Sequence, residues 1–366
     1  MDPQMVNRVL ELAIAIQQIP APTFNERERG VYIQERFLQE GLVDIAIDDV
    51  GNVYGRLPGK TTSQPIVVSA HLDTVFPLDT DLRVERSEDR IAGPGIGDNA
   101  VGVAGLLGLV WEMHQRQVAL NSDLWFVANV GEEGLGNLRG MRALVDRFAD
   151  QPRAYLILEG MALGQIYHRG LGVSRYRITV KTSGGHSWVD YGRPSAVHEL
   201  AQIITRLHAL EIPEQPRTTL NVGVIAGGSS VNTIAAEAHL DLDLRSEDEA
   251  ILGDLVSRVD SVIQYFQSPD VRETMELIGQ RPVGGISQHH PLVEIAVKGL
   301  ETVGIKPRLN IGSTDANIPL SLGYPAICIG LTTGNGAHTV NEFIHIPPLL
   351  MGMHQLLWIV EALDGD

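Results

Sequence analysis

The sequence has little cysteine, few basic residues and no long hydrophobic run, and each shortage excludes a class of protein. The single cysteine, Cys328, rules out an intrachain disulfide, which fits a reducing compartment. Lys and Arg number 28 against 45 Asp and Glu, and the net charge of −17 argues against nucleic acid or an anionic membrane as partner. The longest apolar run, residues 100–111, is too short to cross a bilayer. The first residues lack a basic segment and a cleavage site, so we expect a cytoplasmic protein.

The apolar segments that are present predict an α/β fold. Apolar residues make up 44% of the 366-residue chain, enough for two domains or one large one. Short apolar strands at residues 66–70, 124–130 and 155–158 are separated by helical patterns, and the same alternation returns between residues 292 and 363. This order is typical of a mainly parallel sheet, whose functional sites gather at the carboxyl ends of its strands.

The middle of the chain has a different character. Its strands alternate between apolar and polar residues, as in a half-exposed antiparallel sheet, and they are interrupted by helical segments at about 195–210 and 247–266. We therefore predict a smaller α+β domain at residues 170–282, inserted between the two parts of the α/β domain, residues 1–169 and 283–366.

The N-terminal region reads as two helices and a hairpin. Residues 5–18 have apolar side chains at helical spacing, and Pro20 and Pro22 end that pattern. Thr23 and Glu26 have the spacing of a capping box, which predicts that they open the second helix.

Polar and acidic residues follow the predicted strands or precede the predicted helices. If the parallel strands end at one edge, these side chains converge, and the carboxylates among them would repel one another unless cations were present. A mixed set of imidazole and carboxylate donors is typical of catalytic zinc sites, and manganese or cobalt would also be compatible. The candidates are His71 and Asp73, Asp98, Glu132 and Glu133, Glu159, and His338.

Charge balance suggests how these residues divide their roles. Three carboxylate ligands and two histidines would nearly neutralise two divalent metal ions, with one hydroxide completing the balance; the five ligands would be His71, Asp98, Glu133, Glu159 and His338. Glu132 is then left over as a general base, and Asp73 is placed to fix the ring of His71. For the pair Glu132–Glu133 alone, a solvated acidic turn is the simpler interpretation.

The glycines before Asp98 permit another interpretation. Residues 95–100, GIGDNA, match the dinucleotide fingerprint G-x-G-x-x-A and precede a helix. However, Asp98 would lie against the pyrophosphate, residues 85–92 are too polar for a buried strand, and no acidic strand end follows about 20 residues on. Metal binding is therefore the favoured interpretation of this loop.

The motifs around these candidates resemble those of the dinuclear zinc amidohydrolases and peptidases, the superfamily of carboxypeptidase G, peptidase T, acetylornithine deacetylase and succinyl-diaminopimelate desuccinylase. The resemblance covers nearly the whole chain. It implies His71 and Glu159 on one zinc, Glu133 and His338 on the other, Asp98 bridging them and Glu132 as the catalytic base. The matching segments are SAHLDTV (69–75), GIGDN (95–99), GEEG (131–134), LEG (158–160) and AHTVNE (337–342).

The inserted domain resembles the lid or dimerisation domain of that superfamily. By this resemblance His186, in SGGHS (183–187), stabilises the reaction intermediate from its own or a partner subunit. Asn232 would lie near the substrate, and Arg245 would bind a substrate carboxylate. Without the resemblance, these three residues read as a turn histidine, a hairpin asparagine and a surface cation. A homodimer formed through this domain is the implied assembly.

The resemblance implies a hydrolase of short peptides, of the aminopeptidase or tripeptidase kind, because GSTDAN (312–317) looks like the peptidase T branch. The alternatives are an N-acyl amino acid deacylase or desuccinylase, a carboxypeptidase, or a non-catalytic metal- or peptide-binding protein. The expected ligands are thus a small peptide or N-acyl amino acid and two divalent metal ions, with neither nucleic acid nor a membrane as partner.

Overall fold

The computed structural model describes residues 3–61 and 63–365. The chain forms two compact units. The first unit combines Met1–Gly170 with Gly284–Asp366, and the second is the continuous segment Leu171–Val283. The chain thus passes between the units twice, next to Gly170 and Gly284.

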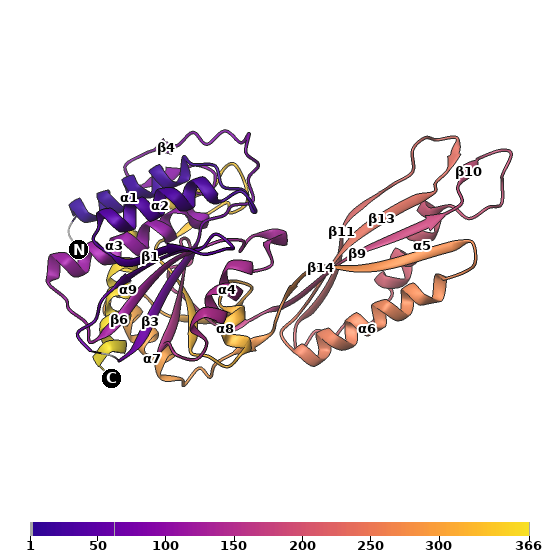
Figure 1. The fold of residues 1–366 in the computed structure, drawn as a ribbon. Helices are drawn as coiled ribbons and strands as arrows, with labels where there is room; N and C mark the ends of the chain where they lie inside the picture. The colour runs from indigo at the N-terminus through magenta and orange to yellow at the C-terminus, as the bar shows by residue number, and fades with distance from the viewer. Residues whose placement is uncertain (1–2, 62, 366) are drawn as a thin grey trace. The chain divides into compact units, whose positions relative to one another are not determined.

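A nine-stranded sheet forms the centre of the first unit (Figure 1). Its strands follow the order β1-β2-β6-β3-β7-β17-β8-β15, and β16 pairs with β8. The four central strands, β6, β3, β7 and β17, are mutually parallel, and antiparallel pairs flank them. The strands are β1 (Val43–Ile47), β2 (Val53–Leu57), β3 (Ser63–His71), β6 (Ser122–Asn129), β7 (Ala154–Glu159), β8 (Gln165–Gly170), β15 (Gly284–Gly285), β16 (Arg308–Gly312) and β17 (Ala326–Gly330).

Helices cover both faces of this sheet, which explains why its central strands are apolar throughout. Alternate residues of a strand point to opposite faces. In β3, Ile66 and Val68 join the core beneath α1, α2, α3, α7 and α9, whereas Val67 joins the core beneath α4 and α8. The predicted mainly parallel α/β fold is confirmed. The helices are α1 (Pro3–Gln17), α2 (Arg27–Gln39), α3 (Val101–Arg116), α4 (Arg139–Phe148), α7 (Pro291–Thr302), α8 (Asn317–Ser321) and α9 (Pro348–Gly365).

A small second sheet of the first unit joins two distant loops. Its strands follow the order β18-β19-β5-β4, and Phe343 pairs with Ala92 between β19 and β5. This pairing brings the segment before Asp98 beside the segment after His338. The strands are β4 (Glu85–Arg86), β5 (Arg90–Ala92), β18 (Gly334–Asn335) and β19 (Phe343–His345), and short helical turns lie at Ile96–Ala100 and Gly134–Gly136.

The predicted capping box at the start of α2 is wrong. Glu26 itself occupies the N-cap position and makes no side-chain cap hydrogen bond there. Its carboxylate pairs instead with Arg139, at 2.7 Å. The Thr23 hydroxyl donates to Asp73 Oδ2, at 2.9 Å. Both side chains make long-range contacts, which outweigh the local pattern that the spacing suggests.

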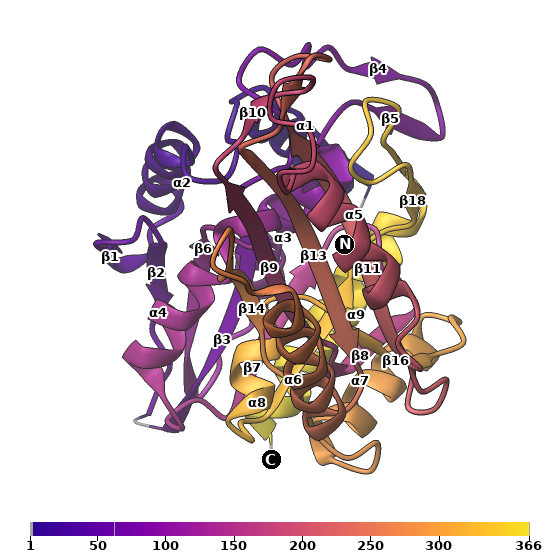
Figure 2. The same ribbon diagram turned by 90° about the vertical axis from the view of Figure 1, so that its right-hand side faces the viewer.

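The second unit is a four-stranded antiparallel sheet, ordered β11-β13-β9-β14, with α5 and α6 packed on one face (Figure 1, Figure 2). Strand β13 alternates as predicted, and Leu240, Leu242 and Leu244 are buried beneath the helices. The sequence pattern predicts neither β14 in this unit nor β8 in the first. The elements are β9 (Gly172–Thr182), β10 (Gly185–His186), β11 (Thr218–Gly227), β12 (Thr233–Ile234), β13 (Glu237–Ser246), β14 (Val271–Arg281), α5 (Ala196–His208) and α6 (Glu249–Phe266). Among the helices that the structure describes, none is long and apolar enough to span a membrane.

Two helical glycines provide a test of the packing of α9. Alanine is usually favoured over glycine in a helix by about 1 kcal/mol. At Gly352, however, a Cβ atom would lie 1.9 Å from the carbonyl oxygen of Leu331, a backbone atom that cannot move aside. At Gly253 in α6, a Cβ atom would meet nothing within 4 Å among the described residues outside the adjoining helix backbone. We predict that Gly352→Ala lowers the free energy of unfolding by about 1–3 kcal/mol.

The matched control is Gly253→Ala, which should raise the free energy of unfolding by up to about 1 kcal/mol. Urea unfolding of both variants and the wild type measures the difference. Equal stabilisation by the two substitutions would mean that α9 does not approach Leu331 as closely as described.

Candidate metal centre

Three parallel strands bring candidate ligands to one edge of the sheet. His71 is the last residue of β3, Glu159 is the last of β7, and Glu132 and Glu133 follow the end of β6. Asp98 lies in the turn before α3, and His338 lies in the loop between β18 and β19. All of the predicted ligands therefore belong to the first unit.

Asp98 lies between two histidines and presents one carboxylate oxygen to each. Its Oδ1 is 3.1 Å from Nε2 of His71, and its Oδ2 is 3.1 Å from Nε2 of His338. Each histidine also faces a glutamate: His71 Nε2 is 3.8 Å from Glu159 Oε2, and His338 Nε2 is 3.3 Å from Glu133 Oε1. The five side chains thus form two triads that share Asp98.

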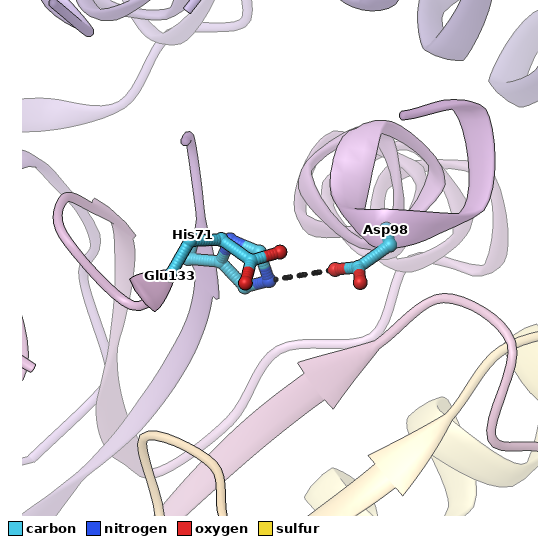
Figure 3. A group of neighbouring side chains, drawn as sticks. All are labelled: His71, Asp98 and Glu133. Atoms are coloured by element: carbon cyan, nitrogen blue, oxygen red, sulfur yellow. Dashed lines mark ion pairs between the residues drawn. The ribbon is translucent and has the colours of Figure 1, made fainter. Parts of the chain in front are cut away.

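The donor atoms have the spacing that metal ligands require. Ligand atoms at about 2.1 Å from a tetrahedral zinc ion lie roughly 3.4 Å from one another, close to the separations in both triads. Donor atoms of His71, Asp98 and Glu133 also lie within 4.8 Å of one another, and their side chains point together in Figure 3. Nε2 of His71 is buried and has no hydrogen-bond partner among the described residues. The donor atoms of this cluster could therefore hold a divalent metal ion.

Asp73 does more than orient His71. Nδ1 of His71 lies 3.0 Å from the backbone carbonyl oxygen of Asp73, and 3.5 Å from its carboxylate. The shorter contact is the hydrogen bond; it places a proton on Nδ1 and leaves the lone pair of Nε2 for a metal ion. The Asp73 carboxylate accepts hydrogen bonds from the backbone N–H groups of Glu132 and Glu133, at 3.0 and 2.9 Å. It therefore fixes the backbone that carries the proposed base and a ligand.

The cluster perturbs the pKa values of its own members. Burial alone would lower the pKa of His71, but Asp73, Asp98 and Glu159 outweigh it and hold that pKa well above its usual value. Asp98 and Glu133 raise the pKa of His338 to about 10. Burial raises the pKa values of Glu133 and Glu159 to about 7. The side chains thus hold protons that bound metal ions would displace.

Glu132, the predicted general base, is buried beside the predicted ligand Glu133. It is 6% exposed, directly precedes Glu133, and has its backbone held by Asp73. This arrangement differs from a solvated acidic turn, because both glutamates are buried.

The three other predicted residues lie in the second unit. His186 and Asn232 are neighbours there: β10 pairs with β12, and the N–H of Ser187 donates to the carbonyl of Asn232, at 3.0 Å. Nδ1 of His186 accepts the N–H of Trp188, at 3.2 Å, so the neutral ring carries its proton on Nε2. Arg245 donates to Asp243 Oδ1, at 2.6 Å, in the ion pair that the surface-cation interpretation describes.

Asp315 and Asn99 also lie at the site, although the sequence pattern assigns no role to either. Asp315 is completely buried, and its Oδ2 accepts a 2.6 Å hydrogen bond from the side-chain amide of Asn129 at the end of β6. Asn99 connects the Asp98 turn to both neighbours of Glu159: its amide donates to Leu158, and it accepts the N–H of Gly160. The only sequence signal was their position inside or next to the motifs.

The nucleotide interpretation of residues 95–100 does not agree with the structure. The backbone N–H groups that would bind a pyrophosphate, those of Gly95, Gly97 and Asp98, all donate to the carboxylate of Glu342. The preceding strands β4 and β5 belong to the small sheet rather than to the central parallel one.

The fold and the site together define a metal-dependent hydrolase of amide bonds. The chain belongs to peptidase family M20/M25/M40, whose family model matches residues 67–361. It is 25% identical to the uncharacterised protein YqjE of Bacillus subtilis, over 98% of this chain and 99% of that protein. It is also 25% identical to a putative succinyl-diaminopimelate desuccinylase of Mycobacterium tuberculosis, over 92% of this chain and 93% of the relative. The crystal structure of a tripeptidase from Staphylococcus aureus has the same fold, with a TM-score of 0.83 and 22% identity over 99% of both chains.

The buried carboxyl group of Asp315 should make the stability of the metal-free protein depend on pH. Burial, followed by the charge of Glu132, raises the pKa of Asp315 from 3.8 to about 8. Between these values the folded protein holds a proton that the unfolded chain has lost, so this carboxyl makes stability fall as pH rises. Asn at this position does not titrate. We predict that Asp315→Asn gains stability relative to wild type between about pH 5 and pH 8.

Urea unfolding of metal-free protein at both pH values measures this gain. Asp254→Asn is the control, because Asp254 has an exposed side chain in α6 and should show no comparable change. The raised pKa would be contradicted if the free energies of unfolding of Asp315→Asn and wild type differed by the same amount at both pH values.

Proposed function

We propose that the protein is an aminopeptidase of short peptides, similar to a tripeptidase, that uses two divalent metal ions, zinc in the first instance. The observation that carries this proposal is the pair of triads that share Asp98, with Glu132 buried beside them. The resemblance of residues 312–317 to the peptidase T branch supports peptides as substrates. Structures described as a tripeptidase and as aminopeptidase PepT have the same fold.

The ligand residues and Glu132 have separate roles in this proposal. His71, Asp98 and Glu159 would hold one ion, and Asp98, Glu133 and His338 the other. Bound ions would supply Lewis acidity, which polarises the scissile carbonyl and lowers the pKa of water. Glu132 accepts a proton from the attacking water and delivers it to the leaving nitrogen. Asp73 keeps Glu132 in place through the backbone.

Residues of the second unit would recognise the substrate and stabilise the oxyanion. His186 carries its ring proton on Nε2, so this nitrogen can donate to an oxyanion. Arg245 would bind a substrate carboxylate. This contact would replace part of the ion pair between Arg245 and Asp243. Asn232 is adjacent to His186 and would donate to the same intermediate.

Hydrolysis of N-acyl amino acids is the second candidate. It is favoured by relatives that align with almost the whole chain, among them the putative desuccinylase and a putative LysW-lysine/LysW-ornithine hydrolase from Thermococcus kodakarensis. A carboxypeptidase is a further alternative, which is supported by several fungal relatives described as probable carboxypeptidases.

We also propose that the protein forms a homodimer through the second unit. The outer strands of its sheet, β11 and β14, each have one unpaired edge among the described strands. Val224 and Ile225 of β11 are exposed by 48% and 55%. An apolar strand edge of this kind is suited to pairing with another chain. Light scattering of the full chain tests this assembly.

Metal content and substrate choice can be tested in one experiment. Protein purified without chelator is analysed for metal per chain, and then assayed on tripeptides, N-acetyl amino acids and N-succinyl amino acids before and after chelation. Two ions and chelator-sensitive tripeptide cleavage are expected. Cleavage of only the acylated amino acids would move the assignment to a deacylase. No bound metal after incubation with zinc or manganese would overturn the proposal.

Glu132 and Glu133 should respond differently to the same substitution. Glu132→Gln removes the base but none of the ligands, so kcat should fall by about 10²–10⁴-fold while metal content stays the same. Glu133→Gln removes a ligand and should lower the metal content. Metal analysis and steady-state kinetics distinguish the two variants. A near-normal kcat in Glu132→Gln would remove Glu132 from the mechanism.

His186 should contribute to the transition state rather than to metal binding. Loss of one oxyanion donor typically lowers kcat by about 10²–10³-fold. We predict a fall of this order in His186→Ala, with little change in KM and none in metal content. The exposed His289→Ala is the control. A change in KM alone would assign His186 to substrate binding instead.

A further inference from the structure

Glu342 is a completely buried carboxylate that belongs to no predicted triad. It follows His338 by four residues and lies immediately before β19. Its Oε1 accepts the backbone N–H groups of Gly97 and Asp98, at 2.7 and 2.8 Å, and its Oε2 accepts that of Gly95, at 3.1 Å. One side chain of the His338 loop therefore holds the turn that carries the shared ligand.

The backbone of Glu342 strengthens this connection. Its carbonyl accepts the N–H of Gly93, at 2.8 Å, and its own N–H donates to Thr339, at 3.1 Å. The Asp98 turn and the His338 loop are thus joined on both sides of Glu342. Gly97 lets the turn approach β19, because a Cβ atom there would lie 2.9 Å from the side chain of Ile344.

The side chain of Asn99 connects the Asp98 turn to the triad of His71, Asp98 and Glu159. Asn99 hydrogen-bonds to the backbone on both sides of Glu159, as described above. These contacts do not involve Glu342. The two connections are therefore complementary, because Asn99 relates Asp98 to Glu159 and Glu342 relates Asp98 to His338.

We propose that Glu342 is a positioning residue that sets the affinity of the Asp98–Glu133–His338 triad for its metal ion. His338 needs such support, because its side chain is 56% exposed and it lies on a loop rather than at the end of a strand. Partners that orient metal ligands typically change metal affinity by about 10–100-fold when they are removed. The inference rests on the proposed function in that it assumes both triads hold metal ions.

Glu342→Gln tests the proposal with little change in shape. A glutamine oxygen can still accept the N–H groups of Gly97 and Asp98, but its NH₂ group then faces the N–H of Gly95, and two donors meet. We expect one of the two zinc-binding constants of the full chain to fall by about 10–100-fold, and the other to stay as in wild type. Zinc titration against a chromophoric chelator measures both constants.

Two further readouts separate positioning from a general loss of structure. The thermal midpoint of metal-free Glu342→Gln should stay close to that of wild type, and excess zinc should restore its turnover. Glu301→Gln, the same chemical change at an exposed site in α7, should leave both constants unchanged. Unchanged constants in Glu342→Gln, or an equal fall in both, would overturn the proposal.

The outcomes also separate this inference from the proposed function. Two zinc ions in wild type without hydrolysis of any panel substrate would end the proposed function, yet the zinc constants would still decide the role of Glu342. No zinc in wild type would end both. If Glu342→Gln does not fold, Glu342→Asp is judged by the same criteria, because it keeps the carboxyl group but shortens the side chain by one methylene group.

Discussion

The site depends on one carboxylate that is shared between two imidazoles. Each oxygen of Asp98 faces one histidine at the same 3.1 Å distance, so neither triad can form without it. His338 and His71 hold the pKa of Asp98 below its usual range, although burial opposes them. A carboxylate that stays ionised while it is buried needs positive charge nearby. The rest of the first unit can be understood as the framework that keeps this group in place.

That framework uses a second kind of buried carboxylate, which binds backbone rather than metal. Asp73 accepts the N–H groups of Glu132 and Glu133, and Glu342 accepts those of the Asp98 turn. Each of these carboxylates comes from a segment that also carries a ligand histidine. Backbone donors compensate the burial of the charge, and the hydrogen bonds connect loops that are distant in sequence. Two buried carboxyl groups that make no predicted contact with metal therefore hold the backbone next to the predicted ligands.

The sequence predicts the parts of this arrangement that follow from periodicity. Apolar runs that end on polar residues predict the parallel strands and the edge where His71 and Glu159 lie, because strand geometry alone determines that edge. The sequence could not predict the links between loops. Local spacing predicts a helix cap at Thr23, whereas the hydroxyl of Thr23 donates to the carboxylate of Asp73, 50 residues away. Nothing local distinguishes Glu342 from any loop acid, since its role depends on the pairing of β19 with β5.

The residues predicted to bind metal and the residue proposed to bind the substrate carboxylate lie in different units. The five predicted ligands, Glu132 and the carboxylates that hold their backbone all lie in the first unit, so the predicted metal centre belongs to one compact body. Arg245, the charged group proposed to bind the substrate, lies in the second unit. In the proposed mechanism, substitutions around Arg245 would alter substrate binding without removing a predicted metal ligand.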